Sequence, residues 1–183
     1  MKPIDIVRRL VLHSRVATTR AGARVLRTRR RQRALASLGL GTAPRTEDPT
    51  LRIVKPADAL GLAEALVDGV PRGMVWDSIW LAHAVAPLAA LLYAASVMGN
   101  GGGITWVCQA AVNPDDDDRE PSWGQAARIC RDWGQRDRSA AHLFSDALQR
   151  LELLNARQRL LIANTMIAAL TPLQTSYGPV TAR

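Results

Sequence analysis

The sequence predicts an all-α protein, a compact bundle of about five or six helices with a basic arm at its N-terminus. Apolar residues recur at helical spacing in several segments beyond residue 55, and clusters of Gly and Pro separate these segments. Ala and Leu provide most of the packing, because the chain has only five Trp, two Tyr and one Phe. No run of alternating residues indicates a sheet. The 183 residues leave room for one domain and an appendage.

The arm is predicted over residues 1–38, and its charge distinguishes it from the rest of the chain. Residues 1–47 contain twelve basic and two acidic side chains, which gives them a net charge of +10. Because the whole chain has a net charge of +8, residues 48–183 carry −2. The arm has a broken apolar stripe, so we expect it to be either helical or disordered. Such charge asymmetry indicates a polyanionic partner for one end of the molecule.

Nucleic acid is the partner that we expect for the arm. An arginine that neutralises a phosphate releases counterions, so the expected binding is insensitive to base sequence. No aromatic residue stands between the arginines, which argues against stacking on single strands. Anionic lipid is an alternative, since Leu and Val accompany the arginines, and an arm that only aids solubility is another. The candidate nucleic-acid-binding residues are Arg24, Arg27, Arg29, Arg30, Arg31 and Arg33.

A linker is predicted over residues 39–54, where Gly and Pro interrupt the helical pattern, and the helical domain over residues 55–173. Asp58 is expected to cap the first helix of this domain, which stops at Gly69. A long second helix is expected over residues 76–98.

Four shorter patterns complete the helical domain. Ser122 is expected to cap one of these helices, and Asn155 with Gln158 resembles a capping box for the last. Pro172 should end that last helix, and residues 174–183 are predicted to be a flexible tail. The four predicted helices span residues 104–112, 122–134, 139–154 and 155–170.

One segment has the length of a membrane span. Residues 79–98 are twenty residues without a formally charged side chain. His83 and Pro87 interrupt the segment, and Asp77 lies just before it, so a buried central helix is the favoured interpretation. A membrane-associated protein remains an alternative.

No motif in the chain favours an enzyme, a cofactor or a metal site. The Gly-rich stretch at residues 99–103 lacks the Lys and the Ser or Thr of a phosphate-binding loop, so a turn between helices is expected. The consecutive acids Asp115–Asp118 do not have the alternating spacing that a calcium loop needs. His13, His83 and His142 are isolated in the sequence and are not expected to be ligands.

The two cysteines, Cys108 and Cys130, have no Cys or His at metal-binding spacing. They are expected to be reduced thiols in the core of a cytoplasmic protein. The N-terminus lacks the pattern of a secretory signal, although the Arg-rich first 35 residues imitate a mitochondrial presequence.

Two stretches resemble the conjugative coupling ATPases of actinobacteria, a type IV secretion family. The first contains APLAALLYAAS at residues 86–96, the Gly-rich turn, ITWV at residues 104–107 and then Asn-Pro; the second is ARQRLLIANTMIAALTPL at residues 156–173. The resemblance implies the all-α lobe of that family, without its motor and without its membrane anchor. It implies an accessory or remnant protein beside DNA transfer, with a nucleoprotein or another transfer-complex protein as partner. A structural helical adaptor without a nucleic-acid role is the alternative.

We expect the protein not to hydrolyse nucleotides. Neither of its two lysines precedes Ser or Thr, so no side chain is placed to engage the terminal phosphates as in the nucleotide-binding loops of this class. Phosphate release from ATP should stay at background with and without DNA. An activity that a point substitution in this chain abolishes would contradict the expectation.

Overall fold

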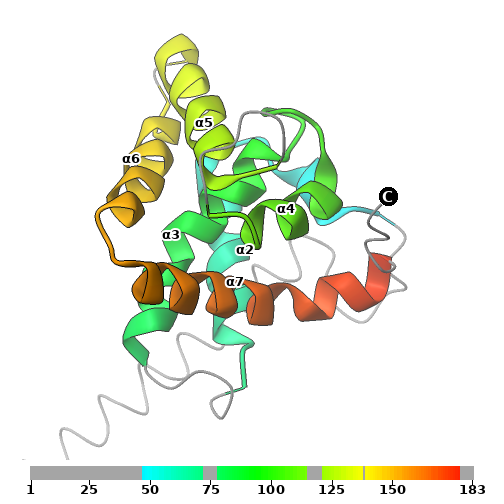
Figure 1. Ribbon diagram of the computed structural model, residues 1–183. Helices are drawn as coiled ribbons and strands as arrows, with labels where there is room; N and C mark the ends of the chain where they lie inside the picture. Colours follow the sequence, from blue (N-terminus) through cyan, green and yellow to red (C-terminus); the bar gives the residue numbers. More distant parts are fainter. Residues whose placement is uncertain (1–46, 72–77, 115–120, 138, 178–183) are drawn as a thin grey trace, which may run out of the picture.

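The computed structural model describes residues 47–71, 78–114, 121–137 and 139–177, and this part of the chain consists of helices joined by turns and loops, without strands (Figure 1). The prediction of an all-α bundle of five or six helices is therefore confirmed for the body. The arm predicted over residues 1–38 lies outside the described residues. In chain order the elements are the 3-10 helix η1 (Pro49–Arg52) and the α-helices α2 (Pro56–Asp68), α3 (Ser78–Ala94), α4 (Gly103–Ala111), α5 (Trp123–Asp137), α6 (Ala141–Glu152) and α7 (Ala156–Tyr177).

Helix α3 lies at the centre of the body and contacts all five other α-helices. Every residue from Pro87 to Ser96 is buried. A helix that is apolar on all sides has to be surrounded by protein or lipid, and here the other helices surround it. Four of the ten residues in this stretch are Ala, and their small side chains let the neighbouring helices approach closely. The buried central helix predicted within residues 79–98 is confirmed, and the turn that follows it begins at Ala95. Within the described ranges, no helix is long and apolar enough to cross a membrane.

Capping residues set the ends of several helices. Ser122 Oγ accepts a hydrogen bond from Gln125 N–H at 3.1 Å, as expected for the cap of α5. The capping box before α7 is also present, because Asn155 Oδ1 accepts from Gln158 N–H at 3.0 Å and Gln158 Oε1 accepts from Asn155 N–H at 3.2 Å.

We expected Asp58 to cap α2, but the N-cap residue is Lys55, three positions earlier. The helix begins at Pro56, and Asp58 lies one turn inside it. Its carboxylate accepts from Lys55 N–H at 2.9 Å and thus still serves the N-terminus of the helix.

The last helix is longer than predicted. We expected Pro172 to end it near residue 170 and residues 174–183 to be a flexible tail, but α7 continues to Tyr177. Proline lacks the N–H that would continue the helical ladder, so its place in the helix must be stabilised by packing. Pro172 is exposed, whereas the next residue, Leu173, is buried in the core. Burial of Leu173 therefore extends the helix beyond the proline.

The linker predicted over residues 39–54 is also too long. Thr50 and Ile53 have no exposed surface, and η1 contacts α4. The body therefore begins no later than Asp48, and residues 39–46 lie outside the described residues.

Helices α5 and α6 form a closely packed pair that stands at one end of the body (Figure 1). Gly134 lies in α5 where the backbone of α6 passes beside it. A Cβ atom at this position would lie 2.6 Å from the backbone nitrogen of His142. The close approach of the two helices therefore depends on the absence of a side chain at residue 134.

Two glycine substitutions test this packing. Gly134→Ala should lower the free energy of unfolding by about 1–3 kcal/mol, because α5 and α6 have to move apart. Gly61→Ala is the control, since a Cβ atom there has no neighbour within 4 Å. Alanine should stabilise that helical position by up to about 1 kcal/mol. Chemical denaturation measures both values, and equal effects at the two positions would contradict the packing argument.

Candidate nucleic-acid interface

The six arginines predicted to bind nucleic acid lie outside the described residues. They are Arg24, Arg27, Arg29, Arg30, Arg31 and Arg33. The structure instead describes the point at which the arm joins the body, from Glu47 onward. The acidic run Asp115–Asp118 and His13 also lie outside the described residues.

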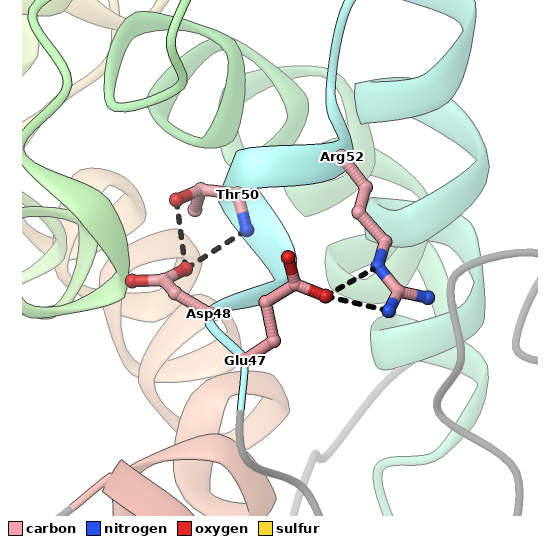
Figure 2. Close-up of polar contacts among 4 residues, drawn as sticks. All are labelled: Glu47, Asp48, Thr50 and Arg52. Carbon is pink, nitrogen blue, oxygen red and sulfur yellow. Dashed lines mark hydrogen bonds and ion pairs between the residues drawn. The ribbon is translucent and has the colours of Figure 1, made fainter.

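Asp48 attaches this end of the body to a helix far along the chain. Its Oδ1 accepts hydrogen bonds from Thr50 N–H at 2.8 Å and from Thr50 Oγ–H at 2.7 Å (Figure 2). Its Oδ2 accepts from the backbone N–H of Ile104 at 2.8 Å, across 56 residues of sequence. Ile104 is in the first turn of α4, where backbone N–H groups have no partner within the helix. One carboxylate therefore caps both η1 and α4.

Gly103 makes room for this carboxylate. A Cβ atom at Gly103 would lie 2.5 Å from Asp48 Oδ2. The backbone of Gly103 has a φ of +68°, which glycine adopts without steric cost and other residues rarely adopt. The glycine is needed both for the turn before α4 and for the approach of Asp48.

Glu47 and Arg52 form an ion pair beside this attachment, with 2.6 Å between Arg52 Nη2 and Glu47 Oε2 (Figure 2). Both side chains are about half exposed. Exposed pairs of this kind contribute about 0–1 kcal/mol, since water and salt screen them. We therefore assign the attachment mainly to Asp48.

Sequence reasoning placed Asp48 in the linker, although a local signal was present. Asp48 is followed by Pro49, and an acidic cap followed by proline at the first helical position is a typical helix start. The bond to Ile104 had no such signal, because its two partners are distant in the sequence.

The Gly-rich stretch is a turn between α3 and α4, as expected. All five of its backbone N–H groups donate to acceptors within the protein, so none points outward as in a phosphate-binding loop. The acceptors are the Ser96 carbonyl for Gly99 and Gly101, the Ala94 carbonyl for Asn100, Asn100 Oδ1 for Gly102 and the Ala95 carbonyl for Gly103. The next N–H, that of Ile104, binds Asp48.

Both cysteines are free thiols buried in the core, as expected. Burial raises the pKa of Cys130 to about 12, and its thiol lies 3.6 Å from the Ala90 carbonyl oxygen. Burial also raises the pKa of Cys108, against a smaller lowering by a hydrogen bond with Gln174. Both groups are therefore protonated at neutral pH, and a protonated thiol is a weak nucleophile and a poor metal ligand.

The two described histidines, His83 and His142, are exposed and lie on different helices. The ring of His83 lies 6.2 Å from that of Trp80 on the same helix. Nδ1 of His142 lies 2.9 Å from the Ser139 carbonyl oxygen. In the described ranges, no three His, Cys, Asp or Glu side chains gather as a metal site would require.

Comparison with protein-family models, curated proteins and solved structures finds no match to this chain. The resemblance to the coupling ATPases therefore remains a prediction from the sequence.

Asp48 can be tested against its neighbour Glu47. Asp48→Ala leaves the N–H groups of Thr50 and Ile104 without their acceptor, and should lower the free energy of unfolding by about 1–3 kcal/mol. Glu47→Ala removes the half-exposed ion pair with Arg52 and should change this value by less than about 0.5 kcal/mol. Thermal and urea unfolding of the full chain measure the difference. Equal losses in the two variants would show that Asp48 is not the main attachment.

Proposed function

We propose that this protein is a non-catalytic accessory protein whose arginine-rich arm binds nucleic acid while a helical body presents the arm. The observation that carries the proposal is the division of charge, with +10 on residues 1–47 and −2 on the rest. A single stretch of the arm, from Arg27 to Arg33, contains five arginines. Arginine binds phosphate oxygens with two parallel hydrogen bonds, so such a stretch suits a phosphate backbone.

The attachment at Asp48 supports the proposal that the arm binds nucleic acid while the body presents it. The body has its own core, and Asp48 caps both its first turn, η1, and the first turn of α4. When an arginine outside the core contacts a phosphate, no buried group loses its hydrogen-bond partner. Binding should therefore depend on charge and leave the fold unchanged.

The resemblance to coupling ATPases suggests the setting, a role beside conjugative DNA transfer with a nucleoprotein or transfer-complex protein as partner. It rests on the helical patterns of residues 86–96 and 156–173.

Replacement of the arginine stretch tests the proposal. Changing Arg27, Arg29, Arg30, Arg31 and Arg33 to Gln should remove most duplex DNA binding. If each arginine neutralises one phosphate, the slope of log affinity against log salt should fall in magnitude by about 4. Titration of labelled duplexes of several sequences at a series of salt concentrations measures both effects.

The matched control keeps the charge by changing the same five arginines to Lys, which should retain most of the binding if phosphates are the ligand. The Gln and Lys variants should unfold at the same denaturant concentration as the unmodified protein. Binding to anionic vesicles without binding to duplex DNA would show that the arm is a lipid anchor, and the proposal would be wrong.

A further inference from the structure

The outward side of α2 has no partner in the described part of the chain. Leu60, Glu64 and Asp68 follow one another at intervals of four residues and are exposed on this side, which we call the α2 face. Ala57 and Gly61 complete it. The opposite side of the helix is buried in the core.

The charge of α2 differs from that of every other described α-helix. It contains three carboxylates and no basic residue, whereas α3 and α4 contain no charged residue and each of α5, α6 and α7 contains arginine. Within the described ranges, neither Glu64 nor Asp68 forms an ion pair. The α2 face therefore combines apolar surface at Leu60 with two carboxylates that no cation in the described ranges pairs with. It complements an arm in which Val25, Leu26 and Leu35 flank the arginine stretch from Arg27 to Arg33.

The segment between the arginine stretch and the body is long enough to let the arm reach the α2 face. Residues 34–46 separate the arginine stretch from Glu47, and thirteen residues span at most about 45 Å when extended. Helix α2 has thirteen residues and is about 20 Å long, so the tether permits the arginines to reach it. A short tether gives an effective concentration on the order of millimolar, at which even weak ionic contacts are substantially occupied.

We propose that the α2 face binds the arginine-rich arm of the same chain, and that nucleic acid competes with Glu64 and Asp68 for the same arginines. The docking of the arm is inferred from the complementary charge of the arm and the α2 face. The competition with nucleic acid rests on the proposed function. In the docked arm, the carboxylates of Glu64 and Asp68 bind the arginines that bind phosphates in the nucleic-acid complex. The α2 face thus lowers the affinity for nucleic acid and confines binding to ligands with enough phosphates to displace it.

The first experiment measures duplex DNA binding by the full chain. Glu64→Gln with Asp68→Asn should raise the affinity about two- to three-fold, as expected when a third to a half of the molecules have a free arm. The matched control is Asp132→Asn with Glu152→Gln, which removes the same charge from exposed positions on α5 and α6. The control should change the affinity less. An equal rise in both variants would reflect net charge alone and would overturn the competition.

The second experiment detects docking without nucleic acid. Ala36→Cys and Gly61→Cys place one thiol in the arm and one on the α2 face, where a Cβ atom at residue 61 has open space around it. The native thiols are buried and protonated, so they compete poorly. Oxidised glutathione should form an intramolecular disulfide between the new thiols, read from gel mobility. Adding Glu64→Gln and Asp68→Asn, or duplex DNA, should reduce its yield several-fold.

The two experiments separate the two proposals. If the disulfide forms and depends on Glu64 and Asp68 while duplex DNA does not bind, the docking stands and the proposed function fails. If duplex DNA binds and the yield of disulfide does not depend on these two carboxylates, the docking is wrong and the proposed function stands.

Discussion

The structure depends on the need to bury α3. From Pro87 to Ala94 this helix has no polar side, so water is an unfavourable neighbour there, and five helices cover it. The small side chains on α3 determine how closely the covering helices approach it. Each covering helix then needs only one apolar side, which leaves its outer side available for charge. The distribution of arginines and carboxylates over α2, α5, α6 and α7 is a consequence of this arrangement.

A single carboxylate, that of Asp48, joins the beginning of the body to the helix that follows α3. The N–H groups in the first turn of a helix have no acceptor within that helix. In α4, the N–H of Ile104 finds its acceptor in the distant side chain of Asp48. The same carboxylate starts η1, which leads into α2. Asp48 thus joins η1, at the beginning of the body, to α4, the helix that follows α3. Its neighbour Glu47 also carries a negative charge but is half exposed, and its contribution is correspondingly small.

Features with a local cause could be predicted from the sequence, and features with a distant cause could not. The caps at Ser122 and Asn155 follow from residues three positions apart, and the central helix follows from a continuous apolar run. The extension of α7 beyond Pro172 depends on the burial of Leu173, and the role of Asp48 depends on Ile104. These depend on packing between segments, which no local pattern records. The candidate binding residues were identified from charge alone, and the arginines themselves lie outside the described residues.

The separation of charge also fits the proposed function, in which one chain both folds and binds a polyanion. A net charge of +10 within a compact body would destabilise it by self-repulsion, and this charge belongs to residues 1–47. A body with a net charge of −2 then repels phosphate weakly and attracts the arm weakly. In the proposed docking, the tether gives the weak attraction between the arm and α2 a high effective concentration, and a nucleic acid in solution has to overcome it with many phosphates at once. On this proposal, two exposed carboxylates on α2 suffice to favour long polyanions over short ones.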